Sequence, residues 1–225
     1  MVPLFYRMPT PSLIWAIGVG FLFGLYYFNK TMDFAEDLKQ DVKKELVQSS
    51  ALLNKFLFLD PWVAKTSAFV DPSYLPFYYY LSKYVRPRNL LEVGFSLGLH
   101  SGAFLRANES VEYFLAYQSL NEQPSRLGQK NIWWVYKRDF QLFVGSLLDC
   151  PLREHAWDLV LWDKRLSYDD ARSGMDRVWD HMALDGWFVY ERFTDDNRAF
   201  LDFCKVHQRE PVVFPTRYGV GIIRR

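Results

Sequence analysis

The chain has 225 residues and carries 27 lysines and arginines against 26 aspartates and glutamates, so its formal net charge is +1. This balance argues against nucleic acid as the main partner, because a phosphate backbone is bound by an excess of clustered basic residues. The two cysteines, Cys150 and Cys204, form no C-x-x-C pair, which leaves a structural zinc site and a disulfide framework without support.

The first predicted element is a membrane anchor in residues 1–30. Residues 8–29 contain no charged side chain, and as a helix of 22 residues they would reach ~33 Å, enough to cross a hydrocarbon core. Trp15 near one end and Tyr26 near the other are typical interfacial anchors. A cleaved signal peptide and a buried core helix are the alternatives, but no small-residue cleavage site follows the segment.

The orientation of this predicted single-pass protein follows from its basic residues. Arg7 is the only one before the span, whereas four lysines follow it: Lys30, Lys39, Lys43 and Lys44. Lysines and arginines are retained on the cytosolic side, so the C-terminal part is expected on the cytosolic or matrix side. An organellar inner membrane is one candidate location.

Residues 31–70 are predicted to form a charged stalk helix and a linker. Apolar residues recur at every fourth position: Phe34, Leu38, Val42 and Leu46. Two interpretations stay open, a solvated stalk or a helix that binds other protein subunits beside the membrane. The breaks "DPW" and "DPSYLP" then lead into a globular domain over residues 71–225.

From Asn89 onward predicted strands and helices alternate. Strands are predicted at 90–93, 111–117, 140–144, 157–163, 186–193, 211–215 and 219–225, and helices at 100–107, 121–136, 168–182 and 197–207. This order predicts an α/β fold with a Rossmann-like, doubly wound, mostly parallel sheet of seven strands. Ligands of such sheets bind beyond the carboxyl ends of the strands, where the loop after Val93 begins.

That loop, residues 94–98 (GFSLG), permits two interpretations. One is a glycine loop that holds a nucleotide-like cofactor, with Glu92 as a nearby hydrogen-bond acceptor. The other is a Gly-x-Ser-x-Gly nucleophile elbow of a serine hydrolase, in which Ser96 would need a base and an acid such as His207 with Asp163 or Asp185. An elbow normally follows several strands, and here only one is predicted before the loop, so the cofactor loop is favoured.

The domain from residue 71 to the C-terminus resembles class I S-adenosylmethionine-dependent methyltransferases, nearest to the small O-methyltransferase-like branch. The resemblance rests on "LLEVGFSLGLHS", "FQLFVGSLLD", the segment 157–193 and the closing strand pair. It implies S-adenosylmethionine as the cofactor, bound by the loop residues Glu92, Gly94, Ser96 and Gly98, where Ser96 replaces the family's middle glycine.

Other positions depart from the family pattern. Gln118 and Ser146 stand where the family has carboxylates that hold the adenosine part, so cofactor binding is expected to be weak or lost. Asp163 matches the acid after the fourth strand and is the candidate catalytic residue. Glu191 could be a second acid, but Arg192 replaces the asparagine of the metal-dependent branch, so no metal site is expected.

Three functions therefore stay open at this point. The favoured one is a membrane-anchored, weakly active or non-catalytic accessory or scaffold subunit of a membrane protein complex. The second is an active methyltransferase that acts on a membrane-associated small molecule or protein, and the third is the serine hydrolase. The four histidines show no metal-binding spacing, and His100 is expected to pack beside the loop, with catalysis as its alternative role.

Overall fold

The computed structural model describes residues 74–96, 98–119, 128–129, 132, 140–152, 156–194, 197–214, 216 and 218–225. The chain divides into two compact units, residues 1–37 and 38–225, and every described residue belongs to the second. The predicted anchor, the predicted stalk and most of the predicted helix 121–136 lie outside the described residues. Within the described ranges, no helix has both the length and the apolar character needed to span a bilayer.

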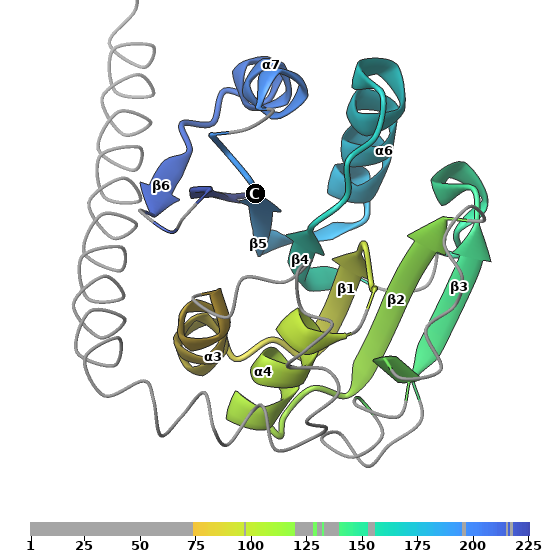
Figure 1. Ribbon diagram of the computed structural model, residues 1–225. Coiled ribbons are helices and arrows are strands. Elements are labelled where there is room, and N and C mark those ends of the chain that lie inside the picture. The colour runs from red at the N-terminus through yellow and green to blue at the C-terminus, as the bar shows by residue number, and fades with distance from the viewer. Residues whose placement is uncertain are drawn as a thin grey trace, which may run out of the picture. The chain divides into compact units, whose positions relative to one another are not determined.

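The described residues form one sheet of seven strands in the order β3-β2-β1-β4-β5-β7-β6 (Figure 1). The strands are β1 Asn89–Val93, β2 Tyr113–Ser119, β3 Gln141–Gly145, β4 Trp157–Trp162, β5 Met182–Glu191, β6 Val212–Phe214 and β7 Val220–Arg224. The strands β1 to β5 run parallel to one another, and β7 runs antiparallel to both β5 and β6. The predicted Rossmann-like, mostly parallel architecture is therefore confirmed for the sheet.

Helices cover both faces of this sheet (Figure 1). The helices α3 Tyr74–Val85 and α4 Leu99–Ala107 pack together on one face, and α6 Tyr168–Asp180 and α7 Arg198–Val206 pack together on the other. A short 3-10 helix, η2 Leu147–Asp149, follows β3. Both faces of the central strands are thus buried, which explains why β4 is nearly continuous in apolar residues.

Two elements differ from the sequence-based prediction. The helix α3 was not predicted, because "DPSYLP" resembles a break; the proline is the third residue of the helix, where its missing N–H costs no intrahelical bond. The strand β5 begins four residues earlier than predicted, at Met182, which pairs with Trp157 before the register shifts between Trp157 and Leu159.

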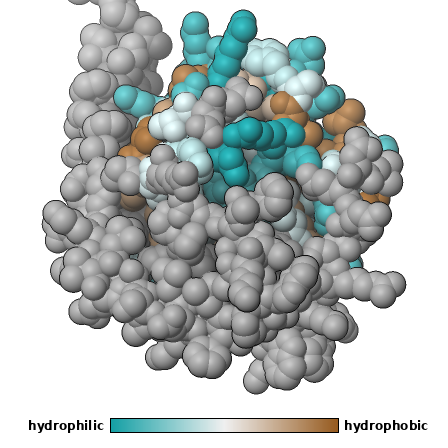
Figure 2. All heavy atoms as spheres, viewed as in Figure 1, coloured by the Kyte–Doolittle hydropathy of each residue, from teal (hydrophilic) through white to brown (hydrophobic). Residues whose placement is uncertain are grey.

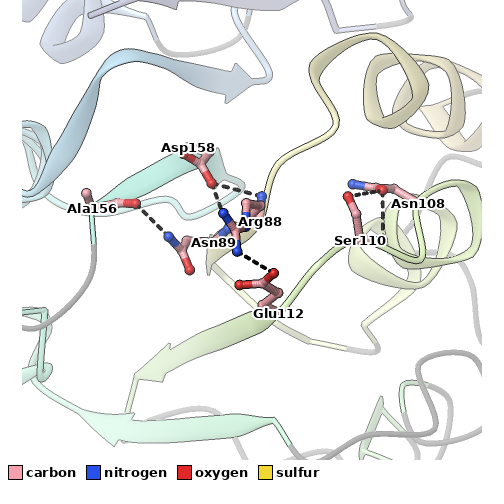
Figure 3. Close-up of polar contacts among 7 residues, drawn as sticks. All are labelled: Arg88, Asn89, Asn108, Ser110, Glu112, Ala156 and Asp158. Carbon is pink, nitrogen blue, oxygen red and sulfur yellow. Dashed lines mark hydrogen bonds and ion pairs between the residues drawn. The ribbon is translucent and has the colours of Figure 1, made fainter.

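Polar contacts hold the beginning of β1 (Figure 3). The carboxylate of Asp158 accepts hydrogen bonds from the backbone N–H groups of Arg88 and Asn89, both at 2.8 Å. The guanidinium of Arg88 donates to Glu112 at 2.6 Å, and the Asn89 amide donates to the carbonyl of Ala156 at 3.0 Å. These bonds join the beginning of β1 to the beginning of β4 on one side and to the residue before β2 on the other.

Candidate active site

The loop between β1 and α4 keeps the backbone of a glycine loop. Its residues 94, 96 and 98 all have positive φ, at 109° for Gly94, 43° for Ser96 and 65° for Gly98. A serine in this conformation costs roughly 1–2 kcal/mol, so the surrounding structure imposes it. Ser96 thus adopts a left-handed backbone conformation that favours glycine.

Gly94 brings this loop against the end of β4. A Cβ atom at this position would lie 2.2 Å from the carbonyl oxygen of Asp163, so no side chain fits. The backbone N–H of Asp163 in turn donates to the carbonyl of Val93 at 2.8 Å. At Gly98 a Cβ would meet the ring of Phe95 at 2.9 Å and Ile132 at 3.0 Å. Both glycines are thus required by close packing within the protein itself.

The structure does not assemble the hydrolase triad considered from the sequence. His207 Nε2 lies 3.1 Å from Asp176 Oδ1, on the neighbouring helix, and its ring packs against Trp179 and Phe203. Asp185 pairs with Arg224 at 3.1 Å. Both residues therefore have contacts elsewhere.

The other predicted cofactor residues differ in accessibility. Glu92 is buried at 1% exposure, and its Oε2 accepts a hydrogen bond from the hydroxyl of Ser101 in α4. Burial raises the pKa of Glu92 well above its ordinary value of 4.5. Gln118 is 2% exposed, whereas Ser146 is exposed and caps η2 by accepting from the N–H of Leu148 at 3.3 Å.

Three ionisable side chains meet beside the loop: His100, Asp163 and Glu191. They come from the first turn of α4, the residue after β4 and the last residue of β5. His100 Nδ1 lies 3.5 Å from Asp163 Oδ2 and 3.3 Å from Glu191 Oε1. From α3, the hydroxyl of Tyr78 donates a hydrogen bond to Glu191 Oε1. We call His100, Asp163 and Glu191 the acid–histidine cluster.

Burial governs the protonation of this cluster. It raises the pKa of Asp163 well above 3.8, with the carboxylate of Glu191 as the next cause, and it lowers the pKa of His100 from 6.5. The pKa of Tyr78 is also raised by burial and then by Glu191. The cluster therefore favours a neutral imidazole at His100 and a protonated carboxyl group at Asp163.

Arg192 turns back onto the cluster. Its backbone is left-handed, with φ 58°, and its Nε lies 3.7 Å from Asp163 Oδ1. Its guanidinium also lies over the ring of Tyr218, 5.3 Å from the centroid. Arg192 thus contributes a cation to the site.

The cluster also has the donor atoms of a metal site. One ligand atom from each of His100, Asp163 and Glu191 lies within 4.8 Å of the others, and imidazole with carboxylates suits divalent transition metals. Against this, Arg192 approaches Asp163 and the Tyr78 hydroxyl occupies Glu191 Oε1. No spacing motif in the sequence joins His100 to the two acids, because the three residues come from separate elements.

A pocket of about 120 Å³ opens from the ends of β4 and β5 toward the first turns of α6 and α7. It is lined by Asp163, Lys164, Arg165, Leu166, Tyr168, Ala171, Tyr190, Glu191, Arg192, Arg198 and Ala199. Figure 2 shows that hydrophilic residues cover much of the described surface on the viewed face, with apolar residues among them. The acid–histidine cluster contributes Asp163 and Glu191 to the pocket lining.

No family model and no curated protein sequence matches the chain. Solved structures do. A Staphylococcus aureus protein assigned as a caffeoyl-CoA O-methyltransferase aligns with a TM-score of 0.66 at 14% identity, covering 81% of this chain and 98% of its own. An S-adenosylhomocysteine-bound methyltransferase of Podospora anserina has a TM-score of 0.58 at 14% identity, covering 80% and 95% of the two chains.

A third match is an O-methyltransferase of Streptomyces achromogenes in complex with S-adenosylmethionine, with a TM-score of 0.58 at 14% identity and coverage of 81% and 95%. At this identity the likeness shows the fold alone. The domain has the Rossmann-like fold of class I S-adenosylmethionine-dependent O-methyltransferases.

Proposed function

We propose that this chain is an S-adenosylmethionine-dependent methyltransferase that acts on an oxygen nucleophile. The observation that carries the proposal is the acid–histidine cluster, in which His100 and Glu191 are buried and Asp163 is half-buried, beside a loop with positive φ at residues 94, 96 and 98. Burying ionisable groups costs folding free energy, and such clusters with shifted pKa values gather at functional sites. Structures of the same fold that hold S-adenosylhomocysteine or S-adenosylmethionine add support, since ligands of such sheets bind beyond the carboxyl ends of the strands.

The residues of the loop fit the amino-acid end of this cofactor. The N-cap residue of α4 is Gly98, which has no side chain to cap the helix. The first N–H groups of the helix are therefore suited to bind a carboxylate. Gln118 and Ser146 offer an amide and a hydroxyl in place of charged acceptors, which is expected to weaken binding. When bound, S-adenosylmethionine supplies an electrophilic methyl group.

The acid–histidine cluster would remove the proton of the acceptor. Because Nδ1 of His100 faces both carboxyl groups, it is the nitrogen suited to carry the proton, and Nε2 then keeps a lone pair. This nitrogen would take the hydroxyl proton while the acceptor oxygen displaces the sulfonium sulfur from the methyl group, so that the C–S bond breaks as the O–C bond forms and the neutral thioether leaves. Asp163 and Glu191 stabilise the resulting imidazolium, and general-base catalysis of this kind contributes about 10²–10⁴-fold.

The second candidate is the non-catalytic accessory subunit favoured by the sequence. Its specific support is the loss of carboxylates at Gln118 and Ser146. It requires that S-adenosylmethionine does not bind, whereas the enzyme requires that it does.

A calorimetric titration separates the two. Full-length protein in a mild non-ionic detergent is titrated with S-adenosylmethionine and then assayed for methyl transfer from labelled cofactor to a membrane extract. We expect binding, and we expect His100→Gln to keep binding while transfer falls about 10²–10⁴-fold. His181→Gln, at the far end of α6, is the matched control and should keep both. No binding by the unmodified protein would overturn the enzyme proposal in favour of the accessory subunit.

A further inference from the structure

The pocket beyond the acid–histidine cluster is strongly cationic. Four basic side chains line it: Lys164, Arg165, Arg192 and Arg198. The acidic residues in the lining are Asp163 and Glu191, which belong to the cluster itself. The lining thus holds four basic residues against two acidic ones, and this excess of positive charge favours an anion in the pocket.

Some of these cations are held in place by contacts within the protein. Lys164 Nζ donates to Ser119 Oγ at 3.1 Å, from the end of the neighbouring β2. The guanidinium of Arg198 lies over the ring of Tyr168, 5.3 Å from the centroid, and the Tyr168 hydroxyl donates to Asp202 at 2.7 Å. The pocket is therefore preorganised by contacts between α6 and α7.

The backbone adds to this charge. Arg198 is the first residue of α7, and Asn197 before it makes no capping hydrogen bond through its side chain. The first turn of α7 contains no acidic residue. The positive end of the α7 helix dipole thus adds to the positive charge of Arg198 on this side of the pocket.

We infer that this pocket binds an anionic group of the methyl acceptor, a carboxylate or a phosphate, and so places the acceptor's hydroxyl against the acid–histidine cluster. That the anion belongs to a methyl acceptor rests on the proposed function, whereas anion binding as such needs no cofactor. The pocket volume of about 120 Å³ suits one small anionic group. Arg192 and Arg198 are both among the lining residues, and a single guanidinium can donate two parallel hydrogen bonds to one carboxylate or phosphate group.

The test is anion binding to full-length protein in detergent, followed by thermal unfolding. Inorganic phosphate and benzoate are the two probes, each compared with chloride at constant ionic strength, so that phosphate and carboxylate recognition are distinguished. We expect at least one probe to raise the melting temperature. Arg198→Ala should weaken its affinity about tenfold or more, and Arg198→Lys should restore part of it. Arg209→Ala, an exposed arginine after α7, is the matched control and should bind as the unmodified protein does.

A circular dichroism spectrum of the Arg198→Ala variant guards against loss of folding, because a folded variant that binds the anion weakly has lost the site and not the fold. No effect of either probe beyond chloride, or equal binding by the Arg198→Ala variant, would overturn the inference. Anion binding without S-adenosylmethionine binding would instead leave the anion site standing and refute the methyltransferase.

Discussion

The hydroxyl of Tyr78 in α3 donates a hydrogen bond to Glu191 at the end of β5, although 113 residues separate them in the chain. The ring of Tyr78 also packs beside His100, with 4.9 Å between the ring centroids. The helix α3, which was not predicted from the sequence, thus packs against the candidate site and supplies one of its hydrogen-bond donors.

Tyr78→Phe is expected to destabilise the protein by about 1.5–3 kcal/mol, because it leaves the buried carboxylate of Glu191 without this charged hydrogen bond. Urea denaturation measures the change. The matched control is Tyr84→Phe in the same helix, where the side chain is 39% exposed and the effect should stay within about 0.5 kcal/mol. Equal stability of the two variants would show that the Tyr78 bond contributes nothing.

Glu92→Gln should change how stability depends on pH. Burial raises the pKa of Glu92 in the folded state above 4.5, so above that pH the folded protein holds a proton that the unfolded chain has released. The unmodified protein therefore loses stability relative to the variant as pH rises, by up to about 1.4 kcal/mol per pH unit, and the difference is constant below about pH 4. Urea unfolding over a pH series measures it.

The control for that series is Glu112→Gln, an exposed carboxylate paired with Arg88, whose removal should alter stability little at any pH. A Glu92→Gln variant that loses stability relative to the unmodified protein as pH rises would contradict the prediction.

Replacing Gln118 and Ser146 by acidic residues should destabilise the fold to different extents. Gln118 is buried, so Gln118→Glu is expected to destabilise the fold by about 1–3 kcal/mol, whereas Ser146→Asp keeps a capping side chain at an exposed position and should change stability by less than about 0.5 kcal/mol. If the cofactor's adenosine end lies beside Ser146, Ser146→Asp also tightens S-adenosylmethionine binding about tenfold in calorimetry. Unchanged affinity in both variants would favour the accessory subunit.

Added Mg²⁺ should leave the melting temperature unchanged, since the cation of Arg192 lies 3.7 Å from Asp163 and repels a second cation. Arg192→Asn removes this charge and adds an oxygen donor, so this variant should gain a Mg²⁺-dependent rise in melting temperature. A rise in the unmodified protein would identify the cluster as a metal site despite Arg192. The same scan with Mn²⁺ tests a softer ion on the His100 nitrogen.

Anchoring by residues 1–30 stays a prediction. Full-length protein should remain in the membrane pellet after high-salt and alkaline washing, because a spanning helix is held by apolar burial and not by charge. Immunoblotting of pellet and wash measures this. Release of the protein into the wash would contradict a span.

The sequence by itself determined the fold of the described domain. Six of the seven strands begin within two residues of their predicted positions. In the central strands β1 and β4 the reason is burial on both faces, which requires a nearly continuous run of apolar residues. The glycine loop could also be placed, since positive φ favours glycine and the loop follows the first strand. The exception, β5, begins early because its first pairing with Trp157 precedes a register shift that no local pattern records.

Only the tertiary structure decided which side chains meet. His100, Asp163 and Glu191 stand in separate elements, and their contact depends on the parallel order β1-β4-β5 and on α4 starting where the loop crosses the end of β4. Their protonation likewise follows from burial, which no single position in the sequence reports. Local sequence sets the backbone pattern of each element, but proximity and desolvation arise only when distant elements pack together.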